Sequence, residues 1–134
     1  MVNISTRKIF LKSSSEGLFE FLGQTENLAK ILAYKKVKHL KVEGDVITFI
    51  LKWAARFNFK ITEITDEYIQ ISSSKGVAFE TAIRFEINSD KKGTSVVIHI
   101  QTDTAPFIDF TFEQKIKNWV TAIADNIEAE FIAA

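Results

Sequence analysis

Hydrophobic and polar residues alternate with a period of about two through most of this chain and of about 3.6 in three places. Residues 3–12 alternate loosely and predict a first strand. Apolar residues then recur at helical spacing up to residue 22 and again over 26–32, which predicts two short helices. We expect Ser13 and Glu16 to form a capping box ahead of the first helix, and Gly23 to end that helix.

The alternation returns after residue 36 and predicts six strands, at about 37–42, 47–52, 57–62, 69–73, 77–87 and 96–101. Turn residues separate them at 43–45, 65–67, 74–76 and 88–93, the last of which we interpret as a hairpin loop. In 77–87 the apolar residues share one face and the polar residues the other, which is typical of a half-buried strand. Consecutive strands with short turns predict an antiparallel meander.

Helical spacing reappears after Pro106 and predicts one long amphipathic helix. Its apolar stripe consists of Phe112, Ile116, Trp119, Val120, Ile123, Ile127 and Phe131. The inner face of the sheet is the surface on which this stripe can dock. We therefore predict one α+β domain over 1–134 of the helix-grip type, with element order β-α-α-β6-α. In it a curved antiparallel sheet wraps around the long C-terminal helix.

Three short segments carry a family resemblance: the first-helix entry SSEGLFEFL at 14–22, the last-strand start GTSVV at 93–97, and Pro106-Phe107 before the last helix. In this order and spacing they resemble the START/Bet v 1-like superfamily, also called SRPBCC or the polyketide cyclase/dehydrase and lipid-transport group. The resemblance covers nearly the whole chain. It implies a cavity between the sheet and the last helix, which members use to hold sterols, lipids, plant hormones or polyketides. Some members are enzymes and others bind protein partners.

Composition narrows the function classes. Lys plus Arg and Asp plus Glu both number 17, so the net charge is zero, whereas nucleic-acid binders usually carry a basic excess. There is no cysteine, which excludes disulfides and zinc–thiolate sites. No apolar run approaches the roughly 18 residues of a membrane span, and the first residues lack a signal-like apolar core. We expect a cytoplasmic protein with no nucleic-acid partner and no membrane span.

The sequence offers little reaction chemistry. His99 has outward parity and is interpreted as a solvated histidine without a placed partner, and the parity of His39 is unclear. The serines at 13–15 fit a helix cap better than a nucleophile cluster. Asp103 and Asp109 flank Pro106, where an acid–base pair is the alternative to a charge near a helix start. We predict no catalytic residues, no metal and no cofactor.

Lysines cluster at positions 30, 35, 36, 38 and 41. One interpretation is contact with anionic headgroups or nucleic acid. The favoured interpretation is a solvated loop and edge strand, where lysine also blocks edge pairing.

The 12 phenylalanines against 2 tyrosines and 2 tryptophans give the clearest functional indication, since phenylalanine has no polar handle. We predict an apolar ligand cavity, with Thr81, Ser73 and Thr102 as its few polar groups. The favoured function is binding of a small lipid-like or polyketide-like molecule. A protein-interaction module or homodimer with a filled core, and a cyclase or dehydratase using His39 or Asp103, stay as alternatives. The predicted cavity residues are Phe49, Phe57, Phe59, Ile71, Phe79, Thr81, Ile83, Phe85, Ile98, Phe112, Ile116, Trp119 and Ile123.

Overall fold

The computed structural model describes residues 2–51, 56–73, 80–90, 93–102 and 110–132. These residues form three helices and one eight-stranded antiparallel sheet of order β1-β8-β7-β6-β5-β4-β3, with β2 also beside β8. The strands are β1 (Val2–Ser5), β2 (Ile9–Leu11), β3 (Val37–Glu43), β4 (Val46–Leu51), β5 (Arg56–Ile64), β6 (Tyr68–Ser73), β7 (Thr81–Asp90) and β8 (Gly93–Thr102). The helices are α1 (Ser15–Leu22), α2 (Thr25–Leu32) and α3 (Phe110–Ile132).

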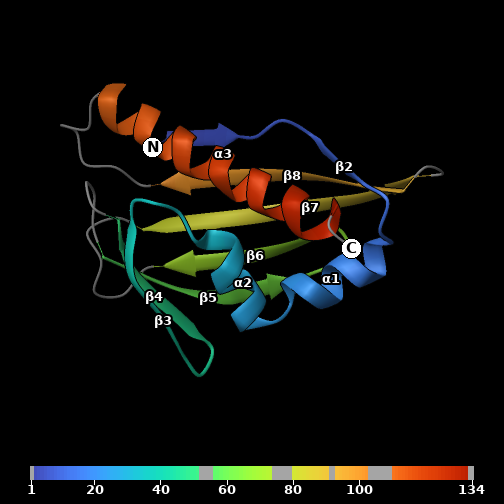
Figure 1. The fold of residues 1–134 in the computed structure, drawn as a ribbon, viewed down its shortest axis with the longest axis horizontal. Helices are drawn as coiled ribbons and strands as arrows, with labels where there is room; N and C mark the ends of the chain where they lie inside the picture. The colour runs from blue at the N-terminus through green and yellow to red at the C-terminus, as the bar shows by residue number, and fades with distance from the viewer. Residues whose placement is uncertain (1, 52–55, 74–79, 91–92, 103–109, 133–134) are drawn as a thin grey trace.

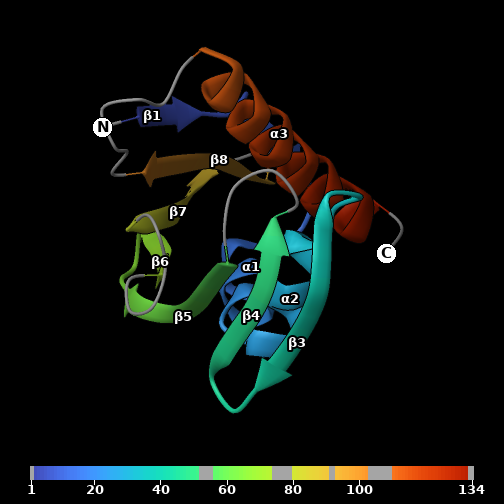
Figure 2. The same cartoon turned by 90° about the vertical axis from the view of Figure 1, so that its left-hand side faces the viewer.

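The sheet bends into an arc, and the helices lie on its concave side (Figures 1 and 2). Figure 2 shows α1 and α2 within the arc and α3 across its open side. The predicted fold class is confirmed: one antiparallel meander of six strands follows two short helices, and a long C-terminal helix closes the concave face. No helix within the described ranges is both long and apolar enough to span a lipid bilayer.

Two side chains of α3 fasten the helix to the end of α2. The Trp119 indole N–H donates to the Leu32 carbonyl at 3.3 Å, and the Asn126 amide donates to the Ile31 and Ala33 carbonyls at 2.9 and 2.8 Å. The last carbonyls of a helix have no partner within it, so these donors satisfy groups that would otherwise need water. These hydrogen bonds hold α3 against the C-terminal end of α2.

The predicted first strand is broken into β1 and β2. Val2 faces Thr102 in the register, but Ile9 faces Val96, so the N-terminal strand carries one extra residue between them. Thr6 bridges the break: its N–H donates to the Ile98 carbonyl, and its hydroxyl accepts from the Ile98 N–H.

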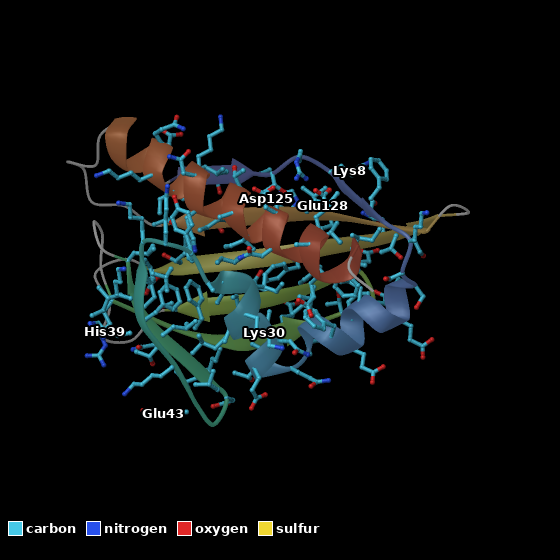
Figure 3. The ribbon with its side chains drawn as sticks, in the orientation of Figure 1. Lys8, Lys30, His39, Glu43, Asp125 and Glu128 are labelled. Atoms are coloured by element: carbon cyan, nitrogen blue, oxygen red, sulfur yellow. The ribbon has the colours of Figure 1, made fainter. Side chains whose placement is uncertain are left out.

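Arg7 lies between β1 and β2, and its side chain reaches α3. Its guanidinium contacts Asp125 and Glu128 of α3 at 2.9 and 3.3 Å (Figure 3 labels both carboxylates). All three side chains are well exposed, so we expect these ion pairs to add little stability.

The predicted capping box is wrong by one residue. Helix α1 begins at Ser15, so Ser14 is its N-cap, and its hydroxyl accepts from the Gly17 N–H at 3.1 Å. Ser13 belongs instead to the connection from β2, where its carbonyl accepts from the Thr94 hydroxyl at 2.6 Å. Glu16 therefore lies in the first turn, where its charge favours the helix without a capping role. The expected end at Gly23 is confirmed.

The predicted hairpin at 88–93 is present, but its two strands extend further than expected. Strand β7 continues to Asp90, which faces Gly93 at the start of β8. Polar residues at 88–90 looked like a loop, but exposed strand ends carry the same residue types. The predicted turn at 74–76 and the strand start at 77–79 lie outside the described residues.

Candidate functional site

The concave face of the sheet is a wall of apolar side chains. Every predicted cavity residue whose side chain is described is buried, namely Phe49, Phe57, Phe59, Ile71, Thr81, Ile83, Phe85, Ile98, Ile116, Trp119 and Ile123. Phe79 lies outside the described residues, and Phe112 falls in α3 with its side chain outside them. The period of two brings the strand residues to one face, and the period of about 3.6 turns the α3 residues toward it.

Four aromatic rings meet under α3. The rings of Phe49, Phe57 and Phe59 lie with their centroids 5.6–5.8 Å apart, and Trp119 stands against all three at 5.8–6.4 Å. These separations are usual for interacting aromatic pairs. The four residues link β4 and β5 to the middle of α3.

A row of hydroxyl groups borders this wall. Thr81 faces both Ser73 and Thr102 in the register, and all three side chains are buried on the inner face. The Ser73 hydroxyl accepts from the Asn58 N–H at 2.9 Å, next in sequence to Phe59 of the aromatic cluster. The Thr102 hydroxyl is buried without a hydrogen-bond partner in the described part of the chain. A buried unpaired hydroxyl is costly, so it marks a place where a polar ligand atom would be favourable.

The outer face of the same sheet carries a row of polar side chains that the sequence did not reveal. Ser5, His99, Arg84, Gln70 and Glu63 face one another in turn across β1, β8, β7, β6 and β5. Arg84 donates to the Gln70 amide oxygen through Nε and Nη2 at 3.1 and 2.8 Å. The only available signal was outward parity, which does not tell which residues of different strands are neighbours.

The row continues through Tyr68. The Arg84 guanidinium lies over its ring, 3.7 Å from the centroid, and its phenol donates to Glu63 at 2.6 Å. This hydrogen bond, aided by desolvation, raises the pKa of Tyr68 above the ordinary value for a phenol. Tyr68 thus contacts both Arg84 in the middle of the row and Glu63 at its end.

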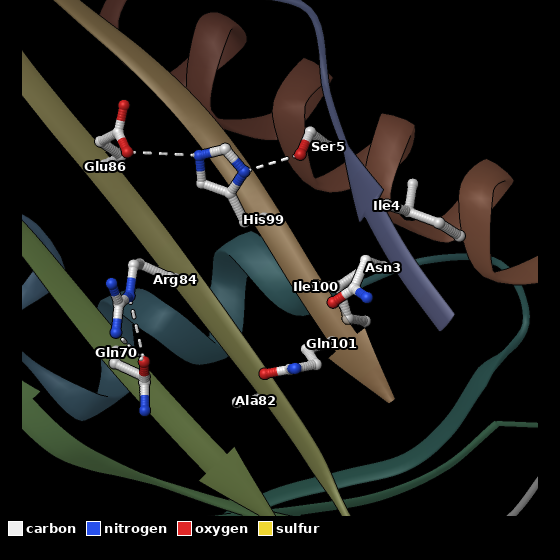
Figure 4. A pocket seen from close by; sticks show the side chains of 10 residues that line it. All are labelled: Asn3, Ile4, Ser5, Gln70, Ala82, Arg84, Glu86, His99, Ile100 and Gln101. Carbon is white, nitrogen blue, oxygen red and sulfur yellow. Dashed lines mark hydrogen bonds and ion pairs between the residues drawn. The ribbon is translucent and has the colours of Figure 1, made fainter. Parts of the chain in front are cut away.

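His99 is the main correction in the site. It lies on the outer face as predicted, but it is not a histidine without partners. The Ser5 hydroxyl is 2.6 Å from Nδ1, and a Glu86 carboxylate oxygen is 3.4 Å from Nε2 (Figure 4). The three residues border a hollow of about 320 Å³ above the small side chain of Ala82. The bulge after Ser5 and the two bonds from Thr6 to Ile98 hold Ser5 beside the imidazole.

The other candidates that the structure describes do not lie on the concave wall. His39 is exposed in β3, where its φ of 57° accompanies a register shift between Lys38 and Lys41. Asp103 and Asp109 lie outside the described residues. Ser14 acts as a helix cap. Among the described side chains, no group of three histidines or carboxylates is arranged to hold a metal ion.

Apart from Lys30, which is an exposed residue of α2, the lysine cluster lies where the favoured interpretation placed it. Lys38 and Lys41 belong to β3, the edge strand of the sheet. Lys41 contacts Glu43 at 2.8 Å, and its ammonium holds the pKa of that carboxyl below the usual range. A second outer-face hollow of about 550 Å³ begins beside this pair and extends over β4 and β5.

Several solved structures have the same fold as this chain. A START superfamily protein from Mycobacterium smegmatis superposes with a TM-score of 0.72 at 10% identity, over 98% of this chain and 97% of the other. The chain has a START-like fold. The solution structure of the KanY protein superposes with a TM-score of 0.76 at 10% identity, over 98% of this chain and 99% of the other. A conserved protein from Geobacillus kaustophilus superposes with a TM-score of 0.71 at 13% identity, over 98% of this chain and 96% of the other.

No protein-family model matches the sequence, and no curated protein matches it. With identities this low, the structural likeness establishes the START-like fold and no particular ligand or reaction. The resemblance read from the sequence is confirmed at the level of the fold.

Proposed function

We propose that this protein binds a small, mainly hydrophobic molecule between the concave face of its sheet and α3. The observation that carries the proposal is the arrangement of an aromatic wall beside a row of buried hydroxyls, of which Thr102 is unpaired in the described structure. An apolar surface with a few convergent polar groups is the usual composition of a small-molecule site. The START-like fold of the chain is consistent with this use.

In the proposed complex, the apolar body of the ligand contacts Phe49, Phe57, Phe59 and Trp119. Its polar end accepts or donates a hydrogen bond at the Thr102 hydroxyl. The affinity comes chiefly from buried apolar area, at roughly 25 cal/mol per Å² before the costs of association. The ring contacts must open for the ligand to enter, because these side chains touch one another in the structure without ligand.

The test uses tryptophan fluorescence in a Trp53→Phe background, which leaves Trp119 as the single tryptophan. Palmitate, cholesterol and an anthraquinone are titrated separately. The expected result is a saturable change in Trp119 emission with at least one of them. A raised unfolding temperature with the same compound is also expected, because a ligand at about 100 times its Kd adds about 2.7 kcal/mol of stability. No response to any of the three would contradict the proposal.

A matched pair of variants locates the site. Thr102→Val is expected to weaken binding of the responding compound roughly fivefold, the worth of about one hydrogen bond. Thr48→Val, on the outer face of β4, is expected to leave the affinity unchanged. Equal losses in both variants, or a loss in Thr48→Val alone, would place the ligand elsewhere.

A further inference from the structure

The hollow on the outer face brings together a serine, a histidine and a carboxylate from three neighbouring strands. Ser5 comes from β1, His99 from β8 and Glu86 from β7 (Figure 4). This hollow lies on the face of the sheet opposite to α3 and shares no side chain with the aromatic wall. It therefore needs an explanation separate from binding in the interior.

Electrostatics selects one form of the neutral imidazole. If Nδ1 carried the proton, the lone pair of Nε2 would face the Glu86 carboxylate at 3.4 Å, which is repulsive. If Nε2 carries the proton, its N–H faces that carboxylate, and Nδ1 is free to accept from the Ser5 hydroxyl at 2.6 Å. Nε2 is shielded from solvent and makes no aligned hydrogen bond among the described groups, so Glu86 is its nearest electrostatic partner.

A hydroxyl that donates to an imidazole oriented by a carboxylate is the arrangement that activates a serine for attack. Ser5 is itself exposed at the hollow and is open to a reagent. We propose that Ser5 is a nucleophile activated by His99, with Glu86 as the residue that sets the histidine tautomer. The substrate class is a small activated acyl ester whose acyl part fits a hollow of about 320 Å³.

The reaction consists of two acyl transfers. Ser5 Oγ forms a bond to the ester carbonyl carbon while its proton passes to His99 Nδ1. The bond to the leaving alkoxide then breaks, and the alkoxide takes that proton and departs as an alcohol. Water next attacks the acyl-serine, gives its proton to Nδ1, and releases the acid as the proton returns to Ser5. No metal or cofactor is required by this balance.

The first test measures the activation itself. The protein has no cysteine, so a Ser5→Cys variant places a single thiol beside His99. Ser89→Cys is the matched control, because Ser89 is an exposed residue of β7 that faces Thr94 and no histidine. We expect iodoacetamide to alkylate the Ser5→Cys thiol at least about tenfold faster at neutral pH, since a nearby imidazole promotes the thiolate.

The double variant Ser5→Cys/His99→Gln should lose that advantage and react at the rate of the control. Circular dichroism checks that each variant is folded, and the Ser89→Cys comparison corrects for exposure. Equal rates in Ser5→Cys and Ser89→Cys would overturn the proposal, as would a fast rate that survives His99→Gln.

The second test uses the natural serine. After incubation with p-nitrophenyl acetate, mass spectrometry of the whole protein and its peptides should find one acetyl group on Ser5. Ser5→Ala and His99→Gln should each lower this adduct at least about a hundredfold, while Ser89→Ala leaves it unchanged. Acetylation of lysines alone, or hydrolysis that persists in Ser5→Ala, would contradict the assignment. The outcome is independent of ligand binding in the interior, since a Thr102→Val variant should be acetylated normally.

Discussion

The two faces of this sheet are built from alternate residues of the same strands and use them differently. On β7, Ile83 and Phe85 face inward onto the helices and are fully buried. Arg84 and Glu86, their neighbours in sequence, face outward into a network of polar contacts. The inner face is stabilised by the burial of apolar surface and by close packing. The outer face is stabilised by hydrogen bonds and ion pairs, which form only at specific distances. Loss of a side chain should therefore have large effects on the inner face and small, chemical effects on the outer face.

The largest effect is expected in the aromatic cluster. Phe59→Ala should lower the free energy of unfolding by about 3–5 kcal/mol, because it removes a buried ring and leaves a cavity under Trp119. Lys60→Ala, the next residue along β5 and exposed on the outer face, should change it by less than about 0.5 kcal/mol. Chemical denaturation measures both. Similar losses of unfolding free energy in Phe59→Ala and Lys60→Ala would contradict the proposed difference between the inner and outer faces.

The fastening of α3 to α2 should produce the next largest effect. Asn126→Ala removes two hydrogen bonds to the end of α2, of which the one to the Ile31 carbonyl is partly buried, so we expect a loss of about 1–3 kcal/mol. Asn118→Ala, whose partner Gln114 is exposed on the same helix, is the control and should be nearly neutral. If Asn126→Ala were equally neutral in denaturation, these bonds would not hold the helix.

Two buried threonines of β8 differ in whether their hydroxyl has a hydrogen-bond partner. Thr94 donates to the Ser13 carbonyl, so Thr94→Val should destabilise the fold by about 1–2 kcal/mol. The Thr102 hydroxyl is unpaired in the described structure, so Thr102→Val should be neutral or stabilise by about 1 kcal/mol in the protein without ligand. Thermal unfolding of both variants tests this. A loss in Thr102→Val as large as in Thr94→Val would show that Thr102 has a structural partner.

The smallest effect concerns Tyr68 on the outer face. Its folded pKa lies above the ordinary value of 10.0, because ionisation would lose the hydrogen bond to Glu63. A raised folded pKa gives a stabilising contribution that is present below about pH 10 and lost as the pH rises through the folded value. Ultraviolet titration of tyrosinate, with Tyr68→Phe to assign the transition, should find it shifted upward. A transition at or below 10.0 would contradict this contact.

Prediction from sequence succeeded where a short-range period decides the structure. Alternation along β7 and the helical stripe from Ile116 to Ile127 each assign a face without knowledge of any partner. The cap at Ser14 was missed because three consecutive serines offer equivalent starts, and contacts of the folded chain such as the hydrogen bond from Thr94 to the Ser13 carbonyl distinguish them.

The outer-face site was missed for a different reason. Whether Ser5 meets His99 depends on the pairing of β1 with β8 and on the extra residue between Ser5 and Ile9. A shift of one position would move Ser5 to the other face. Register between strands more than ninety residues apart leaves no local trace in the sequence. The unpaired hydroxyl of Thr102 is likewise a property of three-dimensional placement.

A ligand on the concave side of the sheet under α3 would lie within reach of protons on both β8 and α3. Nuclear Overhauser contacts between the bound compound and isotope-labelled protein locate it. We expect contacts from the ligand to the Trp119 indole and the Thr102 methyl group. Contacts confined to outer-face residues such as Thr48 or Ser72, with none to Trp119, would contradict it.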